Sequence, residues 1–88
     1  PLNPTYLDTY AWILFKIENY LEALYFIEQA VNNGGDDNGV ILEHYGDILF
    51  KNGNVEEAVK YWKLASSLED ETSSVLEQKI KLERYIPE

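Results

Sequence analysis

The sequence repeats itself at an offset of 35 residues, and this repetition constrains the fold more than any other feature. Within residues 7–30, ten positions carry an amino acid that recurs 35 residues later. Composition alone would give roughly one or two such matches. The longest shared stretch is Ile13–Lys16, which returns as Ile48–Lys51. A period of this length is typical of chains built from repeated units that stack on one another.

Apolar residues recur every three or four positions within each unit. Leu7, Ala11 and Leu14 form one stripe. A second stripe beside it consists of Tyr6, Tyr10, Ile13 and Ile17. Such spacing places each stripe on one helix face, and two adjacent stripes indicate a helix that is covered on two sides. We expect helices near residues 4–17, 20–32, 39–52, 55–68 and 74–86, in antiparallel pairs because the connections within pairs are short.

The expected breaks between these helices carry helix-capping residues. Asn3 precedes Pro4 and is predicted to cap the first helix. Asn19 and Asn54 each stand three residues before a Glu, as in a capping box, and Ser74 does the same before Glu77. Gly53 is predicted to end a helix in the left-handed conformation. Residues 32–39 are predicted to form a loop because they contain only Asn, Asp and Gly.

Small residues occupy matching places in the two units. They are Ala11 with Gly46, Ala23 with Ala58, and Ala30 with Ala65. With this helix–turn–helix unit of about 34 residues, the chain resembles the tetratricopeptide repeat (TPR) family. The resemblance implies an all-α fold, an α-solenoid of antiparallel hairpins, within a single domain over residues 1–88. Repeat 1 would span residues 4–38, repeat 2 residues 39–72, and a C-terminal capping helix residues 73–88.

The chain also departs from the family pattern. Gly35 and Asp70 stand where the family usually has proline, and Leu7 and Leu42 where it often has tryptophan. The stripe of Tyr6 and its helical neighbours has no earlier helix to cover it, so we expect further repeats before residue 1. On this resemblance the chain is interpreted as the C-terminal repeats of a longer bacterial TPR protein.

Composition argues against several classes of function. The net charge of −9 disfavours nucleic acid and anionic lipid as partners, and no apolar run is long enough for membrane insertion. The chain has no cysteine and no motif for a metal or a cofactor. His44 shares a helix face with Asp47, but no nucleophile accompanies the pair, so we expect no catalytic residue and no enzyme.

The family resemblance implies a concave groove lined by the first helix of each pair. Carried over by position, the groove residues are Thr5, Asp8, Trp12, Phe15, Lys16, Val40, Glu43, Asp47, Phe50 and Lys51. Trp12 is the predicted anchor, because tryptophan is frequent in binding hot spots. It is alternatively a packing residue, since tryptophan is highly buried in most folds.

The expected function is a scaffold for another protein or peptide of apolar or basic character. Acidic peptides are disfavoured because Asp8, Glu43 and Asp47 would face them. The alternative is a structural element that self-associates, or stacks with further repeats, through its uncovered N-terminal helix.

Overall fold

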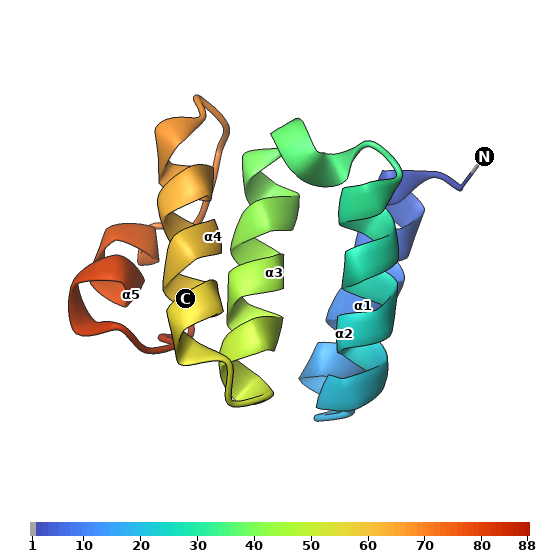
Figure 1. Cartoon of the computed structure of the whole chain (residues 1–88), viewed down its shortest axis with the longest axis horizontal. Coiled ribbons are helices and arrows are strands. Elements are labelled where there is room, and N and C mark those ends of the chain that lie inside the picture. The colour runs from blue at the N-terminus through green and yellow to red at the C-terminus, as the bar shows by residue number, and fades with distance from the viewer. Residues whose placement is uncertain (1) are drawn as a thin grey trace.

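Residues 2–88 of the computed structural model form an all-α fold with no β-strand in that range (Figure 1). The helices are α1 (Pro4–Lys16), α2 (Tyr20–Asn32), α3 (Gly39–Lys51), α4 (Val55–Ser67) and α5 (Leu76–Leu82), with a short 3₁₀ turn, η1 (Gly35–Asp37), before α3. They pack as sequential antiparallel pairs, α1 with α2 and α3 with α4. Figure 1 shows the two pairs side by side and α5 beyond α4. The predicted all-α class is confirmed.

The helix caps are only partly as predicted. Asn3 accepts hydrogen bonds from the backbone N–H groups of Thr5 and Tyr6, at 2.9 and 3.3 Å, so this cap is confirmed. Asn19 and Asn54 precede their helices but make no side-chain cap, so the predicted capping boxes are wrong there. Their backbone N–H groups instead donate back to the preceding helix in both turns.

The two tight turns within the pairs share one backbone geometry. Asn19 N–H donates to the Leu14 carbonyl over 2.8 Å, and Asn54 N–H donates to the Leu49 carbonyl over 2.9 Å. This is the Schellman pattern, which needs a left-handed residue just past the helix. Gly53 supplies it in the second pair, as predicted, with φ of 87°. Glu18 holds the equivalent place in the first pair, with φ of 64°.

The C-terminal helix differs most from its prediction. α5 begins at Leu76 and ends at Leu82, much shorter than the predicted range of 74–86. The capping box at Ser74 is wrong, because the Ser74 N–H and hydroxyl donate to the Glu88 carboxylate at 2.9 and 3.2 Å. Glu83 takes a left-handed conformation and ends the helix.

Small residues let the helices of each pair approach closely, as predicted. Ala11, Ala23, Ala30, Ala58 and Ala65 are completely buried. Gly46 makes the closest approach, since a Cβ built there would lie 2.4 Å from the Trp62 ring. Trp62 itself is completely buried between α3 and α4.

The predicted second stripe on α1 is exposed. Tyr10 and Ile13 are 47% and 54% accessible, and Tyr6 and Ile17 are more accessible still. The equivalent residues on α3, Tyr45 and Ile48, are buried because α3 packs between α2 and α4. The Tyr45 hydroxyl donates to Glu28 of α2, and its ring lies against Tyr61 of α4. None of the helices in residues 2–88 is long and apolar enough to cross a bilayer.

Candidate functional site

A buried ion cluster lies where α3 meets the C-terminal segment. Lys79 of α5 is 3% accessible, and its Nζ lies 2.8 Å from Glu43 Oε2 and 2.8 Å from Asp47 Oδ1. Glu43 and Asp47 stand four residues apart and so share one face of α3. Ser73 N–H also donates to Glu43 Oε1 over 2.8 Å, and its hydroxyl contacts the same carboxylate. Two carboxylates of α3 thereby hold the C-terminal segment at Ser73, just before α5, and at Lys79 within α5.

Asp47 has a further donor from within the second pair. Trp62 Nε1–H donates to Asp47 Oδ1 over 3.0 Å, so the indole nitrogen is satisfied despite its complete burial. Throughout residues 2–88, every buried side-chain nitrogen or oxygen has a hydrogen-bond partner. Glu43 and Asp47 are therefore occupied by donors of their own chain.

Burial and charge act in opposite directions on the pKa values of this cluster. Burial raises the pKa of Asp47 to about 6, against the attraction of Lys79. Burial would also raise the pKa of Glu43, but hydrogen bonds from Lys79 and Ser73 lower it below its usual value. Burial alone would lower the pKa of Lys79, and the two carboxylates raise it instead. The cluster therefore keeps Lys79 as an ammonium ion.

Beside this cluster lies a hollow of about 410 Å³ between α1, α3 and the C-terminal segment. Trp12 forms an aromatic wall and stacks on His44 and Phe15, with ring centroids 4.0 and 4.5 Å apart. The Lys16 ammonium lies 5.5 Å from the Trp12 ring centroid. Glu71 and Tyr85, from the C-terminal segment, line the opposite side.

His44 pairs with a residue other than the predicted one. Its Nδ1 donates to Asp8 Oδ1 over 2.7 Å, which ties α3 to α1. Asp47, three residues along the helix, is held by Lys79 and Trp62 instead. His44 stacks on Trp12, so the His44–Asp8 hydrogen bond orients the aromatic wall.

The structure brings five of the ten predicted groove residues to the hollow. They are Trp12, Lys16, Val40, Glu43 and Asp47. Asp8 and Phe15 lie behind this surface, where Asp8 holds His44 and Phe15 packs on Tyr20 and Tyr85.

The other three predicted groove residues lie elsewhere. Thr5 is exposed in the first turn of α1, where its backbone bonds to the Asn3 cap. Phe50 is part-buried and packs on Trp62, and the Lys51 ammonium lies over the rings of Tyr20 and Tyr85. These three residues do not line the hollow, whereas residues of the C-terminal segment do.

Sequence reasoning missed the residues that the C-terminal segment contributes. Ser73, Lys79 and Tyr85 all line the hollow. The sequence predicted a capping helix over residues 73–88 but no site residue within it. Within residues 2–88, Lys79 is the only cation that forms a salt bridge with the two carboxylates of α3. A sequence signal for it existed only as unmatched acidic charge at Glu43 and Asp47.

Aromatic and charged side chains together line the hollow. No cluster of three or more His, Asp or Glu side chains within residues 2–88 could hold a metal ion. The hollow does offer an aromatic surface, with carboxylates and the ammonium groups of Lys16 and Lys79 around it. Aromatic side chains that are partly desolvated give large contact area at low entropic cost.

The fold and the hollow define a small all-α domain of paired helices with an aromatic-walled surface depression. Comparisons with protein-family models, with curated proteins and with solved structures found no match to this chain.

Proposed function

We propose that this chain is a TPR-like α-solenoid module that binds a peptide or helix of another protein in the hollow beside Trp12. The observation that carries the proposal is the aromatic wall of Trp12, held in place by the His44–Asp8 pair and reachable from solvent. The 35-residue repeat and the paired helices support the family assignment. They do so independently of the hollow.

The chemistry of the hollow favours a partner with a large apolar side chain next to a basic one. Trp12 offers its ring to the apolar group, and a cation beside that ring gains a further interaction with the π-system. Lys16 already lies over Trp12 in this way. The partner's cation would meet Glu71 and Glu88 at the rim, since Glu43 and Asp47 already hold Lys79. An acidic partner would meet those same rim carboxylates and be repelled.

A displayed library of random peptides, selected on the 88-residue chain, tests this proposal. Selected peptides are expected to combine an aromatic or long aliphatic residue with Lys or Arg. Trp12→Ala is expected to weaken their binding by roughly tenfold or more, as for a hot-spot residue. Tyr25→Ala is the matched control, because Tyr25 is an exposed aromatic on α2 outside the hollow.

A charge reversal tests the same site without disturbing packing. Glu71→Lys should weaken binding of basic peptides, while Glu69→Lys should not, because only Glu71 lines the hollow and both side chains are exposed. Circular dichroism confirms that each variant folds. Peptides that bind equally well to Trp12→Ala and Glu71→Lys, or a selection that enriches only acidic peptides, would refute the proposal.

A further inference from the structure

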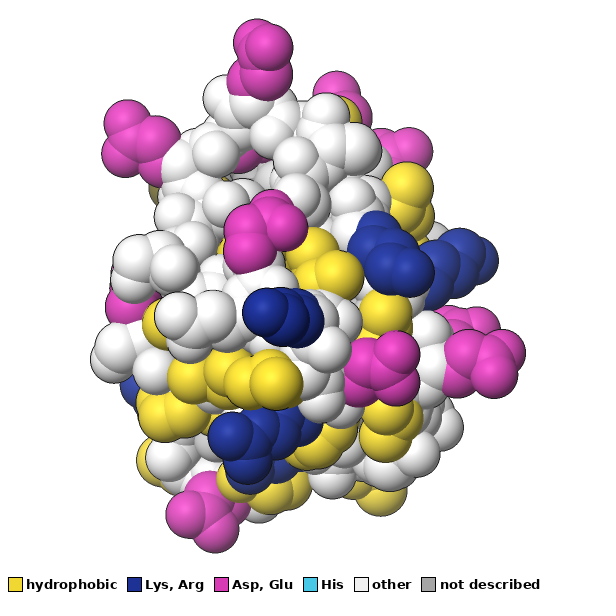
Figure 2. Space-filling view, turned by 90° about the vertical axis from the view of Figure 1, so that its left-hand side faces the viewer, with side chains coloured by type: hydrophobic (Ala, Val, Ile, Leu, Met, Phe, Trp, Pro, Cys, Tyr) yellow, Lys and Arg dark blue, Asp and Glu magenta, His cyan; other side chains and the backbone are white. Residues whose placement is uncertain are grey.

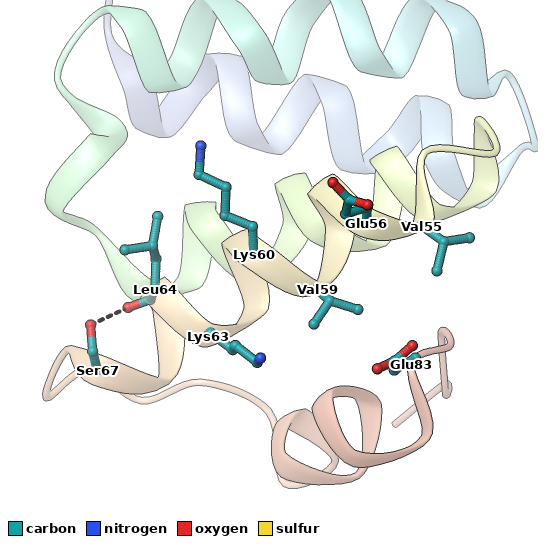
Figure 3. A pocket seen from close by; sticks show the side chains of 8 residues that line it. All are labelled: Val55, Glu56, Val59, Lys60, Lys63, Leu64, Ser67 and Glu83. Carbon is teal, nitrogen blue, oxygen red and sulfur yellow. Dashed lines mark hydrogen bonds between the residues drawn. The ribbon is translucent and has the colours of Figure 1, made fainter.

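A second depression lies on the opposite end of the molecule from α1. It has a volume of about 740 Å³ and lies along α4, facing α5 (Figure 3). Its floor is apolar, with Val55 and Leu64 39% and 43% accessible and Val59 between them. Figure 2 looks onto this end and shows hydrophobic side chains interspersed with lysine and arginine. We call this depression the α4 groove.

The repeat explains why the α4 groove is apolar. Val55 and Val59 correspond, 35 residues earlier, to Tyr20 and Leu24 of α2. That part of α2 is covered by α3: Asn52 donates to the Tyr20 carbonyl over 2.9 Å, and the Tyr45 hydroxyl donates to Glu28. Val55 and Val59 thus hold on α4 the positions that α2 uses against the next helix. Glu56 and Lys60, by contrast, correspond to Leu21 and Tyr25, which stay exposed on α2. The short α5 covers only part of the α4 groove.

The exposed stripe on α1 is the other half of the same interface. Tyr10 and Ile13 correspond to Tyr45 and Ile48 of α3, which are buried because α3 packs between α2 and α4. One molecule therefore contains one completed interface of this kind, between α2 and α3. It also has an exposed donor half on α1 and a receiving half on α4 that α5 covers only in part; α1 and α4 belong to the two different helix pairs (Figure 1).

We propose that α1 of one copy of this chain docks in the α4 groove of a second copy. The contact is head-to-tail, so each pair leaves one α1 and one α4 groove free. Such a heterologous contact adds further copies instead of closing into a dimer, unless the rotation happens to close a ring. The sequence alone left open which surface would receive α1. The α4 groove lies apart from the peptide site at Trp12.

Charge at the two ends agrees with this pairing. Glu18 and Glu22 are exposed and directly follow Ile17 and Leu21, two of the exposed apolar residues of the α1 end. The one base in residues 2–50, Lys16, is directed to Trp12 instead. The α4 groove carries Lys60 and Lys63 together with the carboxylates of Glu56 and Glu83. Docking would bring Lys60 and Lys63 to a rim that has carboxylates and no competing base. Glu56 and Glu83 line the same groove, so it is the placement of the two lysines, and not the net charge of the groove, that favours this pairing. Two α1 ends facing each other would meet with like charge.

Sedimentation velocity over a concentration series tests the proposal. The average mass of the wild-type chain is expected to rise with concentration and to pass that of a dimer. Ile13→Glu should abolish this rise, and so should Lys60→Glu/Lys63→Glu. The matched control is Lys81→Glu/Arg84→Glu, which makes the same charge change on exposed residues outside the groove and should associate as the wild type does.

A mixing experiment separates head-to-tail docking from general loss of association. Glu18→Lys/Glu22→Lys reverses the α1 end and should also give monomers. Mixed with Lys60→Glu/Lys63→Glu, it should restore association, because each open end then meets an opposite charge. All substituted side chains are exposed, and circular dichroism verifies the helical fold of each variant.

Three outcomes would overturn the proposal. The first is a wild-type chain that stays monomeric at millimolar concentration. The second is a dimer that persists in Lys60→Glu/Lys63→Glu, which would place two α1 stripes against each other. The third is a mixture of the two charge-reversed variants that remains monomeric.

Discussion

The two helical pairs carry closely similar sequences and yet are buried very differently. Ile13 on α1 is 54% accessible, whereas its counterpart Ile48 on α3 is completely buried. Both isoleucines lie in the same four-residue stretch, Ile-Leu-Phe-Lys. The difference arises because α3 lies between α2 and α4. In the described residues, α1 packs on α2 and, less extensively, on α3, and its other side stays exposed. Burial of a repeated residue is therefore a property of its neighbours and not of its local sequence.

The two helix pairs also differ in where their acidic side chains lie and in what those side chains hold. The first pair contributes Asp8, which holds His44 at the edge of the hollow. The second pair contributes Glu43 and Asp47, which are buried and hold Lys79. The second pair thus depends on the C-terminal segment, whereas the first pair contributes no residue to that cluster.

The largest predicted effect concerns Lys79. Lys79→Met leaves Glu43 and Asp47 buried without a counter-ion and is expected to cost about 3–5 kcal/mol of unfolding free energy. Chemical denaturation measures it. Lys81→Met, on the same helix but exposed, should change stability by less than about 0.5 kcal/mol. The triple variant Lys79→Met/Glu43→Gln/Asp47→Asn should recover part of the loss, because no charge is then left unpaired. Equal stability of Lys79→Met and Lys81→Met would contradict the buried cluster.

Substitutions of Ile48 and Ile13 test most directly whether the two helix pairs are buried differently. Ile48→Ala removes completely buried atoms and is expected to cost about 2–5 kcal/mol. Ile13→Ala removes largely exposed atoms and should cost less than about 0.5 kcal/mol in dilute, monomeric protein. Denaturation at low concentration measures both, so that any self-association through α1 does not contribute. Similar losses would mean that the α1 stripe is covered in solution.

A third difference lies in how each pair fills its interior. In the first pair Ala11 and Ile27 hold the places that Gly46 and Trp62 hold in the second. Gly46→Ala forces a Cβ to within 2.4 Å of the Trp62 ring and is expected to cost about 1–3 kcal/mol through overpacking. Adding Trp62→Phe to Gly46→Ala should relieve part of the clash. Thermal unfolding tests both variants, and an unchanged melting temperature for Gly46→Ala would show that the ring is not held there.

Alkaline pH should act on the second pair through Lys79. The pKa of Lys79 is raised in the fold, so its contribution is complete below its ordinary value of 10.5 and is lost as pH rises through the folded value. Burial also raises the pKa of Tyr45 and of Tyr85, which adds loss in the same direction above pH 10. The unfolding free energy should fall by about 1.4 kcal/mol for each unit that a folded pKa exceeds its unfolded one. Lys79→Met should show a shallower fall, and an equal slope in both proteins would refute the assignment.

The smallest predicted effect concerns the two left-handed turn residues. Glu18→Gly should stabilise the chain by up to about 1 kcal/mol, because φ of 64° is strained for a residue with a Cβ. Gly53→Glu should destabilise it by a similar amount, since a Cβ there meets no atom within 4 Å and only the backbone conformation is penalised. Chemical denaturation compares the pair. Effects of the same sign would show that the turns are not equivalent.

Much of the fold followed from sequence pattern. The first four helices begin and end within a residue of their predicted bounds, because their apolar period and their turns are locally encoded. α5 was the exception. Its predicted capping box failed because Ser74 bonds to Glu88, a partner 14 residues away that no local rule includes. Lys79 and Tyr85 were not among the predicted site residues, since they reach the hollow only through the path of the chain after α4.

The sequence by itself determined the repeat, the helix pairs and the small residues that set their spacing, because these depend on contacts between residues close in the chain. It also determined that α1 carries an apolar stripe. Only the tertiary structure decided that Lys79 forms the salt bridges with Glu43 and Asp47 and that a hollow beside Trp12 remains open. The tertiary structure also left the stripe exposed and the α4 groove covered only in part. Pairing a buried charge requires a partner at a defined point in space, and helical spacing fixes a direction on one helix but not the position of the next.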